Sequence, residues 1–383
     1  MTVNNTDLFL VERSGTSHKL QAQNLVAELQ DTDLMLVERS GTSYKATGSD
    51  IKDSLGGGSL PSFDIDDCFS CFEFTGNGTS QTFNLGLDLL SDGGMVWIRN
   101  PTGSDHYVFT TATGNNKALR LNNGGTPGTE SNSLTFTNTG FTLGSNSTFN
   151  GNGNVRAVMV WKCHTGFFDL VTYTGSGSAN TVSHSLGAAP RMVWVKNVES
   201  SGNWAWYIES EGSNGFSEGN VTNNTQSNNI IWDQKCPNTT SFFLDGTYSF
   251  SNENNQDYVA FVFGGSYDPG YPVRFGTYWG KDQGPFEVPS FGDSKKPQFI
   301  LGKCTAAQFG YSTQAAYAID KASGMPGFTN SGSRSIIWRF NTSTVSLGSS
   351  GLTYGTDVFK IDKNDAIISK DSHKYMYMAY RED

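Results

Sequence analysis

The hydrophobic positions of the chain gather in short, dense runs, which are separated by stretches rich in Gly, Asn and Ser. The runs are rich in Val, Phe, Tyr and Trp, residue types that favour β-strands. Two kinds of run recur along the chain. One kind ends in a basic residue and comprises Met95–Arg99, Met192–Lys196 and Phe299–Lys303. The other kind is apolar on both strand faces and comprises Val155–Trp161, Tyr258–Phe263 and Tyr375–Tyr380.

These runs mark three copies of one module, of which the third matches weakly at its start. Each copy opens with an aromatic strand end and a turn containing Gly, at Phe74–Gly78, Tyr173–Gly177 and Tyr278–Gly280. Similarity that recurs at this spacing indicates tandem domains. First and last strands of a copy lie roughly 90 residues apart, the size of a small β-sandwich, and a closing strand that is apolar on both faces suits a central position between packed sheets. We predict sandwich modules at 68–165, 166–268 and 269–383.

A smaller repeat precedes the modules. The segment Thr6–Lys19 recurs as Thr32–Lys45 with only two differences. Each copy predicts a strand, a Ser-Gly-Thr turn and a short returning strand, followed by a brief helical segment. Gly56–Ser59 then forms the strongest linker signal in the chain. The pattern divides this region into a tandem-repeat anchor at 1–55 and a Gly-rich, acidic linker at 56–67.

The first strand of each repeat is apolar on both faces, so a unit of about 25 residues cannot cover it alone. The missing cover is the other copy, another subunit or a docking surface. One interpretation is a small domain that packs on the first sandwich. The interpretation we favour is an attachment element, because two nearly identical units imply two equivalent sockets. Its docking residues are predicted to be Leu8, Leu10, Val11, Leu34, Leu36 and Val37.

Composition supports an all-β chain, in which the anchor is followed by tandem β-sandwich modules of a jelly-roll-like kind. Aromatic residues make up 13% of the 383 residues and charged residues only 16%, which suits aromatic-filled sandwiches better than salt-bridged helices. The formal net charge of −10 argues against binding to nucleic acid. The sequence contains no apolar run near the ~20 residues that span a bilayer, so we expect no membrane insertion.

The five cysteines are odd in number and scattered, and the sequence begins without a secretory signal, which together favour assembly in a reducing cytoplasm. Cys68 and Cys71 have the spacing of half a zinc site, but no second Cys/His pair at suitable spacing completes it. The acidic run Asp64–Asp67 lacks the Gly and Glu of a Ca²⁺ loop and is predicted to be solvated linker. We expect neither a metal nor a cofactor.

Catalytic patterns are lacking as well. Gly175–Ser178 is flanked by glycine like a nucleophile, but it lies in a repeated turn, and the five histidines match no catalytic arrangement. We therefore expect a protein that is not an enzyme. Trp97 and Trp194 occupy equivalent places in the densest strands and are predicted to be core. Trp204 and Trp206 alternate on one strand, where they are either core residues or candidate glycan contacts.

The paired N-terminal repeats and the first two modules resemble virion structural and tail-fibre-like proteins of marine tailed phages, notably cyanophages. The segments that carry the resemblance are Phe74–Gly86, Gly140–Asn146 and Ser183–Lys196, besides the repeats themselves. The match is good from residue 6 to about residue 200, moderate over the rest of the second module and faint in the third. It implies a virion component assembled in the bacterial host cytoplasm, and it brings no catalytic residues.

These observations lead to the hypothesis of a phage tail fibre or spike. Its partners would be other virion proteins of the tail or the region near the portal, and host-surface polysaccharide at the projecting modules. Fibres of this kind lead us to expect a homo-oligomer, specifically a homotrimer. An alternative is a head-decorating or vertex fibre protein. From another class come a carbohydrate-binding module, which would need no paired anchor, and a glycan-active enzyme, which would need converging carboxylates.

Overall fold

The computed structural model confirms the all-β fold class, with antiparallel sheets of the sandwich type. It describes residues 8–13, 16–21, 34–39, 42–47, 61–99, 106–221, 225–227, 231–246, 248–267, 270–281, 286–289, 291, 295–306, 316–321, 335–339, 346–348, 352–355, 358–361 and 371–382. The elements other than strands in these ranges are α3 (Leu89–Asp92), α4 (Ser147–Asn150) and η2 (Glu209–Glu211). None of the described helices is long and apolar enough to cross a membrane.

Module 1 is built from one large and one small sheet. Its strands are β5 (Phe69–Thr75), β6 (Gln81–Asn84), β7 (Gly94–Arg99), β8 (His106–Thr110), β9 (Lys117–Arg120), β10 (Gly128–Thr129), β11 (Leu134–Thr137), β12 (Gly140–Leu143) and β13 (Val155–Lys162). The six-stranded sheet has the order β10-β9-β8-β7-β13-β5, and the three-stranded sheet has the order β11-β12-β6.

Module 2 repeats this plan. Its strands are β14 (Phe168–Thr174), β15 (Asn180–Ser183), β16 (Met192–Asn197), β17 (Ala205–Ile208), β18 (Gly215–Glu218), β19 (Gln226–Ser227), β20 (Ser241–Leu244) and β21 (Asp257–Phe263). The six-stranded sheet runs β14-β21-β16-β17-β18-β19, and β15 pairs with β20.

Module 3 has the same strand order. Its strands are β22 (Val273–Trp279), β23 (Phe286–Pro289), β24 (Pro297–Ala306), β25 (Tyr317–Asp320), β26 (Ser335–Arg339), β27 (Ser346–Gly348), β28 (Leu352–Gly355), β29 (Val358–Ile361) and β30 (Lys374–Arg381). The large sheet runs β22-β30-β24-β25-β26-β27 and the small one β23-β29-β28. In every module, therefore, the last strand lies between the first and the third, and the second strand pairs with the penultimate one.

Each closing strand is buried on both faces, and its two faces pack into two different cores. In β13, Val158 and Val160 pack into the core between the large and the small sheet of module 1. Met159 and Trp161 alternate with them and point into a second core. This second core, here called the shared core, contains residues from all three modules. Among them are Trp97, Trp161, Trp194, Trp206, Phe299 and Tyr380.

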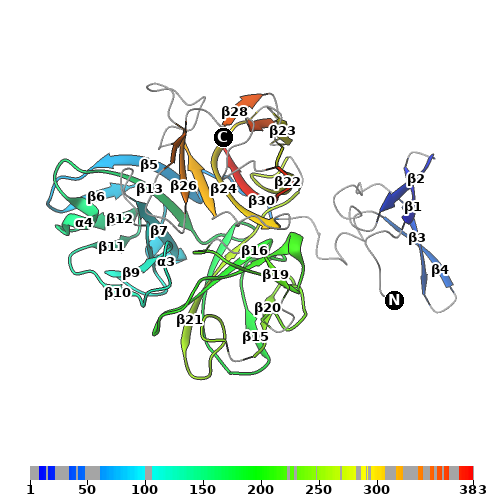
Figure 1. The fold of residues 1–383 in the computed structure, drawn as a ribbon, viewed down its shortest axis with the longest axis horizontal. Coiled ribbons are helices and arrows are strands. Elements are labelled where there is room, and N and C mark those ends of the chain that lie inside the picture. The colour runs from blue at the N-terminus through cyan, green and yellow to red at the C-terminus, as the bar shows by residue number, and fades with distance from the viewer. Residues whose placement is uncertain are drawn as a thin grey trace.

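The modules are arranged around the shared core as three units about a common centre (Figure 1). Trp161 of module 1 donates its indole N–H to the hydroxyl of Tyr380 in module 3 at 2.9 Å, and its ring lies 5.5 Å from that of Phe299. Trp204 of module 2 donates to the carbonyl of Arg120 in module 1 at 2.9 Å. Trp97 and Trp194, predicted as core, are confirmed as buried, and both face this centre.

The basic residue that ends each opening run crosses to another module, and all three are buried. Arg99 of module 1 forms an ion pair with Asp320 of module 3. Lys196 of module 2 donates to the carbonyl of Gly124 in module 1. Lys303 of module 3 donates to the carbonyl of Val221 in module 2 at 3.2 Å. Burial lowers the pKa of each lysine to about 8. The three contacts follow one another in cyclic order, as an approximately threefold arrangement requires.

The stretch before β5 corrects one prediction. Residues 56–67 were expected to form a linker, but Ile65 is fully buried in the shared core. Phe63 packs against the rings of Phe167 and Tyr271 at 5.4 and 5.5 Å. The prediction missed this because it weighed the exposed aspartates of this acidic run above its apolar residues. The described part of the predicted linker, from residue 61 onward, thus belongs to the packed body; Gly56–Ser59 lie outside the described residues.

The N-terminal repeats form a separate four-stranded sheet. Its strands are β1 (Leu8–Arg13), β2 (Thr16–Gln21), β3 (Leu34–Arg39) and β4 (Thr42–Thr47), in the order β2-β1-β3-β4. β1 pairs antiparallel with β3, with Val11 opposite Met35 and Glu12 opposite Leu34. The predicted docking residues lie on β1 and β3, but their side chains, like the expected helical segments, lie outside what the structure describes. Their docking role stays a prediction.

Candidate functional site: a cleft between two modules

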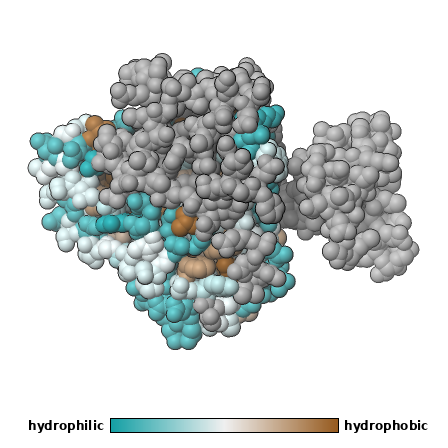
Figure 2. Space-filling model, viewed as in Figure 1, coloured by the Kyte–Doolittle hydropathy of each residue, from teal (hydrophilic) through white to brown (hydrophobic). Residues whose placement is uncertain are grey.

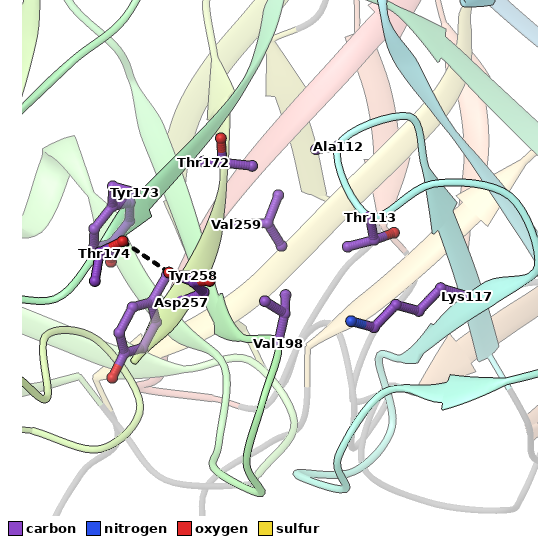
Figure 3. Close-up of a pocket in the computed structure, with 10 residues that line it drawn as sticks. All are labelled: Ala112, Thr113, Lys117, Thr172, Tyr173, Thr174, Val198, Asp257, Tyr258 and Val259. Atoms are coloured by element: carbon purple, nitrogen blue, oxygen red, sulfur yellow. Dashed lines mark hydrogen bonds between the residues drawn. The ribbon is translucent and has the colours of Figure 1, made fainter. Parts of the chain in front are cut away.

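A polar cleft of about 390 Å³ lies between modules 1 and 2 (Figure 3). Its volume is within the ~300–1,000 Å³ typical of small-molecule sites. Module 1 contributes Ala112, Thr113 and Lys117, and module 2 contributes Thr172, Tyr173, Thr174, Val198, Asp257, Tyr258 and Val259. Asp257, Thr172 and Thr174 are exposed, so the cleft is open to solvent.

The module 2 wall is formed where the first and last strands of that module pair. Thr174 on β14 lies opposite Asp257 on β21, and its hydroxyl donates to Asp257 Oδ1 at 2.8 Å. On the opposite face of the same two strands, the rings of Tyr173 and Tyr258 stack at 5.2 Å and pack into the core between the two sheets of module 2. The hydroxyl of Tyr173 donates to a backbone carbonyl, that of Ser251. The wall therefore presents a carboxylate fixed by a hydrogen bond, on strands that are anchored from their other face by an aromatic pair.

The module 1 wall is the turn between β8 and β9. Thr113 is fixed in this turn because its backbone N–H donates to Thr110 Oγ1 at 3.0 Å and the two hydroxyls lie 2.9 Å apart. Lys117 begins β9, and its side chain extends from this wall toward module 2 (Figure 3). Within the part of the chain that the structure describes, its ammonium group makes neither an ion pair nor a hydrogen bond. The cleft thus holds one cation and one anion on opposite walls.

The threefold arrangement places an equivalent contact between modules 2 and 3. Aligned by strand register, Trp279 on β22 and its cross-strand partner Lys374 on β30 stand where module 2 has Thr174 and Asp257. Here the two modules are bridged, because Lys374 Nζ lies 2.8 Å from Glu211 Oε1 of module 2. Glu211 comes three residues after the end of β17, as Thr113 comes three after the end of β8. The two equivalent positions therefore carry different chemistry.

A comparison with protein families covers most of the chain. Residues 64–383 match one protein family, described as a domain of unknown function, DUF7483. The chain belongs to this family. The DUF7483 domain spans all three modules and begins at residue 64, within the stretch that leads into β5 and belongs to the packed body. The comparison with curated proteins gives no significant match.

The glycan-contact interpretation of Trp204 and Trp206 is wrong, since both side chains are 0% exposed. They face the shared core, and Trp194 stacks on Trp206 with ring centroids 4.7 Å apart. The alternative, that they are core residues, is confirmed. Sequence reasoning missed Trp279, which is 57% exposed on the DUF7483 domain. Aligning the three copies would have found it, because the equivalent residues Thr75 and Thr174 are polar and exposed.

The Gly-rich turns of the repeat have a structural role. A Cβ on Gly175 would lie 2.2 Å from the carbonyl oxygen of Glu253, so only glycine fits there. Asn252, which is buried, accepts from the Ser176 N–H at 3.0 Å and donates to the Ser178 carbonyl at 2.6 Å. The Ser176 hydroxyl donates to the same carbonyl. These contacts hold a turn and do not present a nucleophile.

Cys68 and Cys71 are both buried, and neither forms a disulfide. Burial raises the pKa of Cys68 to about 12, which disfavours the thiolate that redox chemistry or metal binding needs. The Cys71 thiol lies 3.4 Å from Asp320 Oδ1 of module 3, across the shared core. Among the described residues, no three His, Cys, Asp or Glu side chains gather as a metal site would require. The two cysteines are best understood as packing residues.

Proposed function

We propose that the protein is a virion structural protein without catalytic activity, a tail fibre or spike of a phage. Its N-terminal repeats attach it to the particle and the DUF7483 domain projects outward. The observation that supports this most is the shared core. Three sheets bury their apolar faces against one another, and three buried cations cross between modules. A rigid, tightly packed head suits a part that must stay folded outside a cell.

The arrangement of the chain supports the same proposal. Two nearly identical hairpins form their own sheet ahead of the head, as a separate attachment element would. The repeats resemble N-terminal segments of marine phage virion proteins. The face of the molecule seen in Figure 2 is largely hydrophilic where residues are described. Such a surface suits a projecting part whose apolar side chains are buried in the core. Its partners would be other virion proteins, and assembly would take place in the host cytoplasm.

Mass spectrometry of purified particles tests the proposal directly. We expect the protein among virion components, and immunogold labelling should place it on the tail. Labelling on the head would favour the head-decorating or vertex alternative. Absence from particles that carry the other structural proteins would refute a virion role.

The attachment role has its own test. Leu10→Asp combined with Leu36→Asp should abolish incorporation into particles, because it puts charges at the centre of the paired strands. A matched variant, Lys19→Ala with Lys45→Ala on the returning strands, should be incorporated normally. Incorporation of the Asp variant at the wild-type level would remove the basis of the attachment model.

A second candidate function, a carbohydrate-binding module, is favoured by the cleft between modules 1 and 2. It is compatible with a fibre, since a projecting head needs a receptor site. A glycan-active enzyme is less well supported. Glycoside hydrolysis uses a pair of carboxylates flanking the bond, whereas Asp257 is the one carboxylate among the described residues that line the cleft.

A further inference from the structure

The two equivalent contacts between modules differ in whether a direct ion pair joins the modules. Between modules 2 and 3, Lys374 and Glu211 meet directly at 2.8 Å. Between modules 1 and 2, Lys117 has no partner among the described residues, and Asp257 is held on the opposite wall by Thr174. The two junctions therefore share one backbone arrangement. An ion pair joins the modules at one of them, and at the other a cation and an anion lie on opposite walls of a cleft.

The lining of the open cleft selects for a ligand whose groups both donate and accept hydrogen bonds. Lys117 can only donate, and Asp257 accepts when ionised. The Thr172 hydroxyl can do both, whereas the Thr113 hydroxyl donates to the Thr110 carbonyl at 3.2 Å and can still accept. Sugar hydroxyls match such a mixed lining. Val198, which is half-buried, supplies apolar surface against which the C–H face of a sugar ring can pack. One positive and one negative charge cancel, so the cleft selects neither an anion nor a cation.

A zwitterion such as a free amino acid also carries both signs, but the openness of the cleft disfavours it. Asp257 is exposed, and an ion pair at an exposed site contributes only about 0–1 kcal/mol. Such a pair would not offset the cost of removing water from two ligand charges. A neutral polyhydroxyl ligand keeps its unused hydroxyls in water and pairs the others along the wall. A chain of sugars can also pass through a cleft that is open to solvent.

We infer that the cleft between modules 1 and 2 is a saccharide-binding site that takes a neutral or N-acetylated oligosaccharide, with Lys117 and Asp257 as its hydrogen-bonding poles. This inference rests on the proposed function, because it supplies the receptor class that a projecting fibre head would recognise. It assigns binding to a junction between modules, and leaves the other described junction as a structural contact.

The test is a printed array of neutral, N-acetylated and acidic oligosaccharides, probed with the labelled full-length protein. We expect retention on neutral or N-acetylated glycans. Lys117→Ala and Asp257→Ala should each weaken binding to the retained glycan by about tenfold, the loss that follows from one hydrogen bond to a charged group. NMR titration with that glycan measures the change.

A variant that closes the cleft gives a second test of the binding site. Thr113→Glu combined with Asp257→Lys transplants the ion pair of the other junction into the cleft, and it should abolish binding without lowering the thermal midpoint. The matched control is Lys374→Ala, which opens the ion pair at the equivalent position and should leave binding unchanged. Thermal unfolding of every variant separates loss of binding from loss of fold.

Four outcomes would overturn the inference. They are no retention of neutral or N-acetylated glycans, retention of acidic glycans alone, displacement of the bound glycan by glycine at equal concentration, and equal weakening by Lys374→Ala. The array uses purified protein and the virion test uses particles, so the two can fail separately. Binding by a protein that is absent from particles would refute the virion role and leave the saccharide site standing.

Discussion

Single residues in this protein owe their burial to neighbours from distant parts of the chain. Trp194 lies between Trp206 and Phe263, each with its ring centroid 4.7 Å away. Trp279, at the end of β22, is 57% exposed. The two tryptophans are chemically identical and differ only in what surrounds them, so substitution should separate their contributions clearly.

Trp194→Ala is expected to lower the free energy of unfolding by about 3–5 kcal/mol, the range for a large buried aromatic that leaves a cavity. Trp279→Ala should change it by less than about 0.5 kcal/mol, as is usual for an exposed side chain. Guanidinium unfolding measures both. Similar losses for the two variants would contradict the assignment of Trp194 to the shared core.

His106 makes stability sensitive to acid. Burial, with a smaller contribution from nearby Arg99, lowers its folded-state pKa to about 3. Below pH 6.5, His106 therefore binds a proton in the unfolded chain and stays neutral in the folded protein. The stability that is present above pH 6.5 is lost as the pH falls toward 3. The loss should reach a few kcal/mol. In chemical unfolding, His106→Gln should flatten this dependence between pH 6.5 and 4; an unchanged slope would show that other groups cause it.

At the scale of elements, the closing strands show how far sequence patterns reach. Their apolar residues on both faces predicted central, doubly covered strands, and β13, β21 and β30 are such strands. The pattern did not reveal that the second cover comes from the other modules, because strand periodicity reports that a face is buried and not what covers it. The same ambiguity left Trp204 and Trp206 open between core and surface.

The cleft could not be predicted in the same way. Lys117 and Asp257 come from different modules, and neither lies in a motif with a characteristic spacing. They approach one another only because the modules pack about the shared core. The clue that the sequence did carry was the comparison between copies, in which Thr174 and Asp257 correspond to Trp279 and Lys374.

The turn after the first strand of module 2 depends on one buried amide. Asn252→Ala removes the acceptor for the Ser176 N–H and the donor for the Ser178 carbonyl. We expect a loss of about 1–3 kcal/mol in the free energy of unfolding, because several hydrogen bonds of one buried side chain are removed together. Asn254→Ala, at an exposed position two residues away, is the control and should have little effect. A neutral Asn252→Ala would mean that water replaces the amide.

On the scale of the whole molecule, the shared core makes the three modules one cooperative unit. Each large sheet has its outer apolar face covered only when the other two are present. The strand order alone would suggest three independent sandwiches, and the sequence repeat suggests the same. The buried cations also tie module to module, since each would lose a contact with another module if the modules separated.

Residues 60–383 should therefore unfold in a single calorimetric transition, with calorimetric and van't Hoff enthalpies that agree. Residues 166–268 expressed alone should not fold, because Trp194, Trp206 and Phe261 would be exposed to water. Three separate transitions, or a folded and monodisperse module 2, would show that the modules are independent. An unfolded 60–383 fragment would instead mean that residues 1–59 are part of the core.

The expected homotrimer can now be tested in two parts. The apolar strands of the head find their partners within one chain, so trimer formation should depend on the N-terminal repeats. Light scattering at micromolar concentration should give a trimeric mass for the full-length protein and a monomeric mass for 60–383. A monomeric full-length protein would refute the trimer, and a trimeric fragment would place the interface on the head.

The position of β30 bears on how the chain is made. This strand lies between β22 and β24, and its Tyr380 accepts the indole N–H of Trp161 from module 1. A ribosome releases module 1 long before it reaches β30, and domains ordinarily fold in the order in which they emerge. Here the nascent chain must hold the inner faces of its first two sheets uncovered until the third is complete. These apolar faces therefore stay exposed to water for as long as translation of module 3 takes. During that time, neighbouring ribosomes on one messenger RNA bring identical apolar faces close together.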